Sequence, residues 1–340
     1  MATSSLTAPA TAAADSLEYP TVLDEKTCVR KGRCPVGKSR GSTSYRIYYE
    51  VHGSLEATHK MVFSFNNTCF AWSNQVEYFA KKPDHAVLVF DNRGVGNSDT
   101  GPIGLYKTSD MARDVVDLLD FLGWNVSRSL HLIGVSMGGM ILQELCLLIP
   151  GRIISVVFTS TKAGDKLSFP PLNVVFMFGR ILMSKSSPEE RMSLFVNRLF
   201  PAAFLDAPAS DGSGRTNREV KEELLLSHHY TRRPQPLSGL LGQLSAVTSH
   251  MCSPEALGRL VASVAPAKIL VLMGTADDVV PLADCLKLHS CLPGAELVVW
   301  EDGGHALCSQ VPERHNRLLE RVMQEGQEAI AAASSSASTA

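Results

Sequence analysis

The sequence predicts an α/β protein with a mostly parallel, doubly wound sheet and an inserted helical segment. Apolar, strand-like runs alternate with helical patterns over residues 45–159 and again from residue 268. This alternation is typical of a parallel sheet with helices on both faces. It breaks over residues 164–254, where only helix-like segments occur. One strand–helix junction, at 134–138, places a serine between two glycines.

The composition limits the classes of partner. A formal net charge of −2 leaves no basic excess to neutralise phosphates, so we expect no nucleic-acid partner. The 8 cysteines form no CxxC pair, which favours free thiols in a reducing compartment over disulfides or a zinc site. No apolar run approaches the roughly 20 residues of a membrane span. We therefore expect a cytoplasmic protein without metal or cofactor; the sequence does not indicate its oligomeric state.

Both ends have the composition of flexible tails. Residues 1–14 and 331–340 are almost all alanine, serine and threonine, and cannot bury enough apolar surface to offset the cost of ordering. We place a tail at 1–27, one domain at 28–325 and a second tail at 326–340. The Ser/Thr-rich start partly resembles a plastid or other organelle transit segment, although it lacks the expected arginines.

The elements follow from apolar periodicity taken in chain order. The region from Cys28 to Val51 is typical of a hairpin, and later β-branched runs predict buried strands. The expected strands are 45–51, 61–65, 86–90, 130–135, 153–159, 268–273 and 296–300. The expected helices are 72–81 and 108–122, one that ends before Pro150, and 174–183, 188–200 and 218–229 within the insert. A Gly-containing loop at 211–214 is expected to be mobile.

The junction at 134–138 predicts a nucleophile. A serine turned sharply between strand and helix is held in a strained conformation, and flanking glycines avoid collisions as the chain doubles back. The turn projects the Ser136 hydroxyl at the carboxyl end of the sheet, while the N-terminus of the following helix favours developing negative charge. An ordinary glycine-rich turn is the alternative interpretation.

A serine nucleophile needs a base and a group that orients the base. Among 10 histidines, His305 follows the strand 296–300 on a glycine-supported loop, at the sheet edge where functional sites gather. The loop after strand 268–273 offers Asp277 or Asp278 as the orienting acid. The other aspartate would then cap the turn.

Four motifs together resemble the α/β-hydrolase family over residues 45–319. GVSMGG resembles the nucleophile turn, DNRGVGNSD the glycine turn, GTADDVVP the acid loop and DGGHA the histidine loop. The resemblance implies an α/β-hydrolase fold, the triad Ser136, Asp277 and His305 in that chain order, and an insert at 164–254 that acts as a lid. It also makes Asp278 a structural neighbour.

The oxyanion-binding stretch departs from the family pattern. Many members carry His-Gly after the early strand, whereas this chain has Phe65-Asn66-Asn67-Thr68. One donor is expected to be the N–H of Met137, and the second Asn67 or Thr68. An asparagine side-chain amide is a further possibility, since such groups also stabilise oxyanions.

These residues predict a carboxylesterase-type serine hydrolase that cleaves a small hydrophobic ester or thioester through an acyl-enzyme. The same triad also serves carbon–carbon bond hydrolysis, and the fold also serves as a ligand receptor without turnover. The intact triad favours an enzyme and the altered oxyanion stretch a receptor. Dehalogenase and epoxide hydrolase chemistry do not fit, because those relatives have a carboxylate where this chain has Ser136.

Overall fold

A computed structural model describes residues 21–37, 41, 44–64, 68–102, 104–164 and 187–338. They contain an 8-stranded sheet with the order β1-β2-β4-β3-β5-β6-β7-β8. The strands are β1 (Cys28–Val36), β2 (Tyr45–Gly53), β3 (His59–Ser64), β4 (His85–Phe90), β5 (Leu130–Val135), β6 (Ile153–Thr159), β7 (Lys268–Gly274) and β8 (Glu296–Trp300). β1 and β2 run antiparallel to their neighbours, and the remaining pairs are parallel. The predicted sheet class and early hairpin are confirmed.

The strand composition follows the position of each strand in the sheet. Every residue of β5 and β6 is buried, and their sequences LHLIGV and IISVVFT are nearly continuous apolar runs. A parallel strand covered on both faces requires such a run, because side chains that point to either face are enclosed. β8 at the edge is only partly buried.

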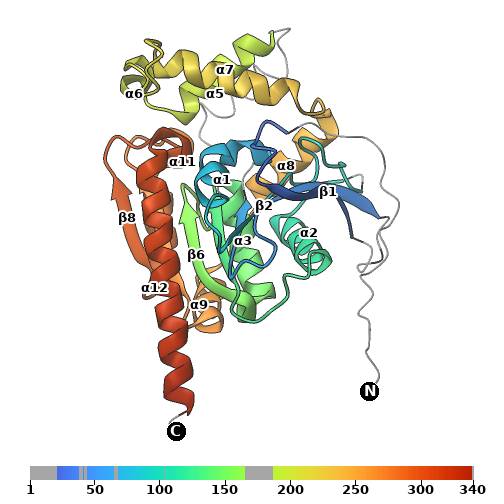
Figure 1. Cartoon of the computed structure of the whole chain (residues 1–340), viewed down its shortest axis with the longest axis vertical. Coiled ribbons are helices and arrows are strands. Elements are labelled where there is room, and N and C mark those ends of the chain that lie inside the picture. The colour runs from blue at the N-terminus through green and yellow to red at the C-terminus, as the bar shows by residue number, and fades with distance from the viewer. Residues whose placement is uncertain are drawn as a thin grey trace.

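Helices cover both faces of the sheet (Figure 1). They are η2 (Cys69–Trp72), α1 (Ser73–Phe79), α2 (Thr108–Phe121), α3 (Met137–Leu148), η3 (Pro150–Arg152), α5 (Pro188–Leu199), α6 (Ala202–Asp206), α7 (Asn217–Tyr230), α8 (Leu237–Ser249), α9 (Pro254–Val264), α10 (Leu282–Ser290), α11 (Leu307–Gln310) and α12 (Pro312–Ser338). Buried residues of α2, α3, α9 and α10 form one apolar cluster with the sheet. Those of α1 and α12 form a second cluster.

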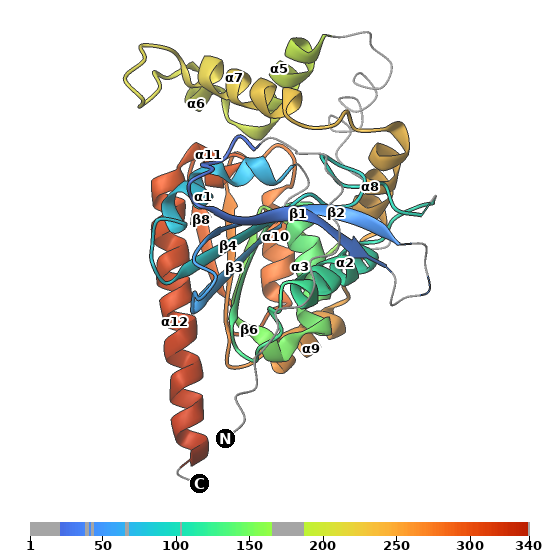
Figure 2. The ribbon, with the colours of Figure 1, turned by 45° about the vertical axis from the view of Figure 1, so that its right-hand side comes forward.

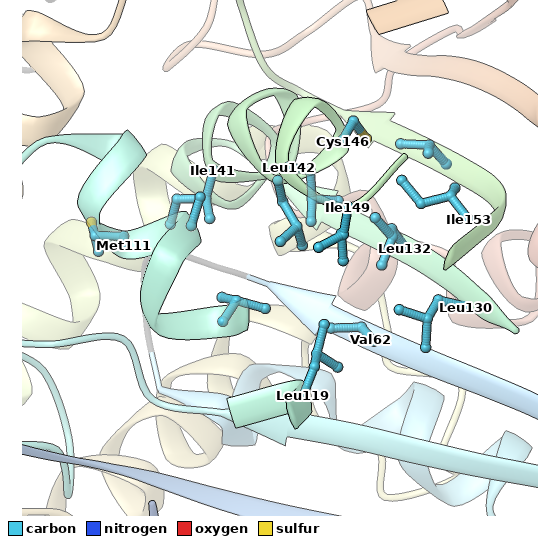
Figure 3. Packing of buried hydrophobic residues seen from close by; sticks show 14 of the residues in the cluster. Val62, Met111, Leu119, Leu130, Leu132, Ile141, Leu142, Cys146, Ile149 and Ile153 are labelled. Atoms are coloured by element: carbon cyan, nitrogen blue, oxygen red, sulfur yellow. The ribbon is translucent and has the colours of Figure 1, made fainter. Parts of the chain in front are cut away.

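The packing of α2 and α3 explains how the nucleophile turn is supported. Met111 and Leu119 recur at helical spacing on α2, and Ile141 and Leu142 lie on α3. In Figure 3 Met111 lies on the side of Ile141, and Leu119 lies beside Val62 of β3. All of these side chains belong to one buried cluster that also contains Leu132 of β5. Burial of a large apolar side chain contributes about 1.5–3 kcal/mol. The helix behind the turn is therefore fixed against the sheet by its apolar face.

The insert contributes helices α5 to α8 between β6 and α9. Sequence analysis predicted helices at 188–200 and 218–229, and α5 and α7 confirm them. Ser187 and Thr216 cap these two helices, each in a capping box with a glutamate three residues later. The third expected helix, 174–183, lies outside the described residues. In Figures 1 and 2, α5, α6 and α7 lie beyond the sheet edge toward which β6 and β8 point.

The folded unit extends beyond the boundaries expected from composition. Leu23 is buried, and the Gly53 N–H donates to the Thr27 carbonyl at 2.8 Å, inside the expected N-terminal tail. At the other end α12 continues to Ser338, and a Cβ on Gly326 would lie 2.6 Å from the Ile154 carbonyl oxygen. Alanine and glutamate are strong helix formers, so a segment that composition alone marks as a tail continues the helix. The flexibility of both ends stays a prediction.

Across the described ranges, no helix combines the length and hydropathy that a membrane crossing needs.

Candidate active site

The nucleophile turn has the geometry that its sequence predicts. Ser136 joins β5 to α3 with φ 57° and ψ −124°, a region that non-glycine residues rarely occupy. A Cβ on Gly134 would lie 2.8 Å from the Gly138 carbonyl carbon and oxygen, so only glycine allows the chain to double back here. The Ser136 N–H donates to the Thr159 carbonyl at 3.0 Å, and the Thr161 hydroxyl donates to the Ser136 carbonyl at 2.7 Å. These two hydrogen bonds hold the backbone of Ser136 in its strained conformation.

Asp277 and His305 are in direct contact. The two carboxylate oxygens of Asp277 lie 3.0 and 2.9 Å from Nδ1 of His305. One of them also accepts the N–H groups of Val279 and Val280 at 2.8 and 2.9 Å. Only 4% of the His305 side chain and 0% of the Asp277 side chain is exposed. Burial alone would raise the pKa of Asp277, but His305 and the hydrogen bonds hold that pKa below its ordinary value.

Close packing of two glycines brings the acid and histidine loops together. A Cβ on Gly274 would lie 2.1 Å from the Gly303 carbonyl oxygen, so neither loop could approach as closely with a side chain at Gly274. Beside this contact, the Ala276 N–H donates to the same carbonyl at 2.9 Å. The Asp302 N–H donates to the Thr275 hydroxyl at 3.0 Å. Backbone packing therefore sets the distance between Asp277 and His305.

Asp278 points away from this pair. Its side chain is 67% exposed, and its carboxylate lies 3.8 Å from Nη1 of Arg198 on α5. Such an exposed ion pair contributes at most about 1 kcal/mol to stability. The structure thus separates the two aspartates that the residues alone left as alternatives: Asp277 contacts His305 and Asp278 faces the insert.

The three predicted residues follow strands at one edge of the sheet. Ser136 follows β5, Asp277 follows β7 and His305 follows β8, and only β6 separates β5 from β7. Met137, the expected first oxyanion donor, is the first residue of α3. Asn67, the expected second donor, lies outside the described residues. Thr68, its alternative, is buried and precedes η2.

Asp91 is a residue of this edge that sequence analysis missed. It follows β4, is 0% exposed, and accepts the N–H of Cys69 at 2.7 Å and that of Asn97 at 2.8 Å. Burial raises its pKa to about 6, while these two N–H groups and the positive charge of Arg232 oppose the rise. Its signal in the sequence was a carboxylate directly between a buried strand and the glycine turn.

The insert contacts both sides of this edge. On the histidine side, the Ala306 N–H donates to the Leu199 carbonyl at 3.1 Å, and the Lys221 ammonium donates to the Ser309 carbonyl at 2.8 Å. On the opposite side, the ring centroid of His228 lies 5.8 Å from that of Phe70. The helices therefore bridge the histidine loop and η2.

The Arg233 N–H donates to Oδ1 of Asn97 at 3.3 Å, and the Gln243 side-chain amide donates to the Arg93 carbonyl at 3.0 Å. These two bonds tie the insert to the glycine turn as well.

Two other features of the described residues do not include the predicted triad. A cavity of about 690 Å³ is lined by the glycine turn and by residues near Arg233, and none of the three predicted catalytic residues lines it. Cys28, Glu50 and His52 bring ligand-type atoms within 4.8 Å of one another. Both ring nitrogens of His52 are already hydrogen-bonded, to Thr27 and Glu50, so hydrogen bonding accounts for this group.

The fold, the strained serine and the buried histidine–aspartate pair define the class of protein. A sequence model described as the alpha/beta hydrolase fold matches residues 51–310, and the chain belongs to this family.

Individual relatives carry different names. RutD of Stutzerimonas stutzeri, provisionally named a carbamate hydrolase, is 25% identical over 279 residues, covering 80% of this chain and 95% of that protein. A thermophilic esterase from Thermogutta terrifontis is 19% identical with a TM-score of 0.65, covering 88% of this chain and 99% of that one. A meta-cleavage product hydrolase from Pseudomonas fluorescens is 17% identical with a TM-score of 0.65, covering 84% and 96%.

Proposed function

We propose that the chain is a single-domain serine hydrolase that cleaves a carboxylic ester or thioester of a small hydrophobic substrate. The observation that carries this proposal is the contact of Nδ1 of His305 with both carboxylate oxygens of Asp277, at 3.0 and 2.9 Å, in which the Nδ1–H donates. A buried carboxylate at Nδ1 fixes the tautomer in which Nε2 is the free base. Ser136 supplies the strained, helix-backed hydroxyl at the same edge.

The proposed reaction has two halves. In the first, Oγ of Ser136 attacks the substrate carbonyl carbon while Nε2 of His305 takes the hydroxyl proton. The tetrahedral intermediate collapses, the bond to the leaving oxygen or sulfur breaks, and His305 returns the proton to the leaving group. In the second, water adds to the acyl-enzyme with His305 again as base, which releases the acid and restores Ser136.

Backbone donors stabilise the negative charge in both halves. Met137, whose N–H is the first donor, is the first residue of α3. The N–H groups at a helix N-terminus have no acceptor within the helix and therefore favour an anion. The second donor is Asn67 or Thr68. Preorganised donors of this kind are each worth about 10²–10³-fold in kcat. Asp277 stays ionised and stabilises the His305 imidazolium, in agreement with the direction of its pKa shift.

We propose that the insert acts as a lid. Its contacts with Ala306 on the histidine side and with Phe70 on the opposite side support this role, since one body spans both sides of the site. The hydrophobic acyl preference rests on the apolar residues of the insert.

A carbamate is a second candidate substrate. It presents the same kind of carbonyl with a leaving group, and RutD of Stutzerimonas stutzeri, provisionally named for carbamate hydrolysis, matches 80% of this chain. Carbon–carbon bond hydrolysis by the same triad and ligand reception without turnover remain the alternatives. Measured hydrolysis rates for matched ester, thioester and carbamate substrates would rank the candidates, and a receptor would turn over none of them.

Covalent labelling tests the nucleophile directly. A fluorophosphonate probe should label the wild-type protein and fail to label Ser136→Ala. Ser160→Ala is the matched control, because Ser160 also has a positive φ, 46°, at the end of the neighbouring strand β6. Loss of labelling in Ser160→Ala with retention in Ser136→Ala would overturn the assignment. Labelling of neither wild type nor variant would favour a receptor.

A further inference from the structure

Asp91 links three segments that meet at the site. One carboxylate oxygen accepts the Cys69 N–H at 2.7 Å, at the start of η2. The other accepts the Asn97 N–H at 2.8 Å, in the glycine turn, and the Asp91 carbonyl accepts the Ser98 hydroxyl at 2.6 Å. The positive charge of Arg232, in the insert, also acts on this carboxylate and lowers the pKa of Asp91. Of these groups, only the carboxylate binds both η2 and the glycine turn.

The two N–H groups bound to Asp91 favour an ionised carboxylate, although burial outweighs them and raises its pKa to about 6. A buried charge is tolerated only when it is hydrogen-bonded, and charge-assisted bonds are roughly twice as strong as neutral ones. Gly96 has a φ of 57°, and a Cβ there would lie 2.1 Å from Oδ2 of Asp91. A side chain at position 96 would therefore collide with the group that binds the Asn97 N–H. The glycine turn therefore encloses this carboxylate.

The bond to Cys69 matters because the chain segment that leads to Cys69 leaves the sheet next to the nucleophile turn. Ser64, the last residue of β3, pairs with Gly134, so the chain leaves the sheet beside the nucleophile turn. The Thr68 carbonyl accepts the Ala71 N–H at 3.1 Å within the first turn of η2, and the next residue, Cys69, is anchored to Asp91. Thr68, one of the two candidates for the second oxyanion donor, directly precedes that anchor. The Cys69–Asp91 bond therefore contributes to the placement of Thr68 relative to the nucleophile turn.

We propose that Asp91 is a positioning residue for the proposed hydrolysis, and that its carboxylate fixes Thr68 and Cys69 at the distance from the nucleophile turn that oxyanion binding requires. This inference rests on the proposed function. Asp91 contacts no substrate; it acts through the Cys69 backbone. A misplacement of about 1 Å in such a donor can cost about 100-fold in rate.

Asp91→Asn is the direct test, because the amide keeps one acceptor but turns an NH₂ group toward the other N–H. We expect kcat for a short-chain nitrophenyl ester to fall about 10²-fold, with KM changed less than about threefold, since the loss falls on the transition state. Gly96→Ala should give the same kcat loss by displacing the carboxylate. Asp99→Asn is the matched control: Asp99 lies in the same turn, but its carboxylate binds the Arg46 N–H and pairs with Arg33 and Arg233 rather than with η2.

Hydrogen exchange gives a readout that does not depend on activity. In the wild type the Cys69 amide should exchange slowly, and Asp91→Asn should accelerate it while Asp99→Asn leaves it unchanged. Equal kcat values for Asp91→Asn and Asp99→Asn, or an unprotected Cys69 amide in the wild type, would overturn the inference. If the Cys69 amide is protected but the protein hydrolyses no ester, the proposed function would be rejected. Asp91 would then have only a structural role, that of holding η2 and the glycine turn together.

Discussion

The histidines at the two edges of the parallel sheet have different surroundings. At the carboxyl edge His305 lies on a loop and shares its Nδ1 with the buried carboxylate of Asp277. At the amino edge His59 and His85 stack with ring centroids 4.6 Å apart, and His131 lies 5.6 Å from His59. Nδ1 of His131 is hydrogen-bonded to the Ser155 hydroxyl at 2.8 Å, and its buried Nε2 has no hydrogen-bond partner among the described residues.

The charge environment explains the difference. Burial, together with the neighbouring His59 and His85, lowers the pKa of His131 to about 3. Burial likewise lowers the pKa of His59. His85 at this edge also has a carboxylate beside its Nδ1, that of Asp84 at 2.7 Å, but the Asp84 side chain is 55% exposed. A buried histidine is thus weak support for catalysis by itself; a fully buried carboxylate at Nδ1, supplied by a different loop as Asp277 is for His305, is the informative feature.

The largest expected effect separates the two edges directly. His305→Gln removes the proposed base and should lower kcat by about 10⁴-fold or more. His131→Gln keeps a hydrogen-bonding group near Ser155 and should change kcat less than about threefold, while altering the melting temperature. Steady-state kinetics of both variants, with circular dichroism as a check on folding, makes the comparison. Similar losses in kcat would remove the distinction between the edges.

The next effect concerns the two neighbouring aspartates. Asp277→Asn should lower kcat by about 10³–10⁴-fold, because the amide permits the wrong imidazole tautomer. Asp278→Asn removes only an exposed contact to Arg198 and should cost far less. The reverse ranking in a kcat measurement would show that the orienting acid is the second aspartate.

Acid should destabilise the protein through the buried histidines. Burial lowers the pKa of His131, His250 and His315 to about 3 and that of His228 to about 4. The unfolded chain binds protons near pH 6.5 and the folded chain only near pH 3–4, so stability falls as pH drops below about 6.5. Each such group removes at most about 1.4 kcal/mol per pH unit. Asp91, whose raised pKa is about 6, opposes this trend.

Urea unfolding at pH 7 and pH 5 measures the trend. The wild type should lose more stability over this interval than His131→Gln, since the variant lacks one of the groups. Identical losses in both proteins would show that His131 does not resist protonation in the folded state.

The smallest expected effect belongs to the proposed lid. Burial of each methylene is worth about 0.8 kcal/mol, so kcat/KM should rise up to about fourfold per CH₂ until the pocket is full, and then fall. Limited proteolysis should cut first at the exposed turn 211–214, and a bound substrate analogue should slow that cut. A flat chain-length series together with ligand-insensitive cleavage would exclude a substrate-sensing lid.

The sequence predicted the strands and turns at the carboxyl edge of the sheet better than the contacts around them. β5, β6 and the turn at Ser136 were predictable because a buried parallel strand needs a continuous apolar run and a tight turn needs glycine. The contact of Asp277 with His305 was predictable in kind, but the choice between Asp277 and Asp278 needed family resemblance. No periodicity distinguishes two adjacent aspartates on one loop.

Long-range backbone contacts explain what the sequence could not predict. The Cys69 N–H and Asp91 are 22 residues apart, and nothing local marks either as a partner. The same is true of Gly274 and Gly303, whose close approach appears only when two loops are packed. The continuation of α12 was missed because an alanine- and serine-rich composition was taken to indicate a tail, whereas alanine also favours the continuation of a helix.

The bond between Ala306 and Leu199 has a consequence for protein engineering. One peptide after His305, the backbone is attached to the C-terminal end of α5, and Gly304 leaves room for that approach: a Cβ there would lie 2.7 Å from the Leu199 carbonyl oxygen. A chimera that exchanges the whole insert for a relative's would cut this attachment and release the proposed base along with the lid. An exchange of the insert that aims to change substrate preference should therefore keep the native residues from Leu199 through Pro201 and replace only the segments beyond them.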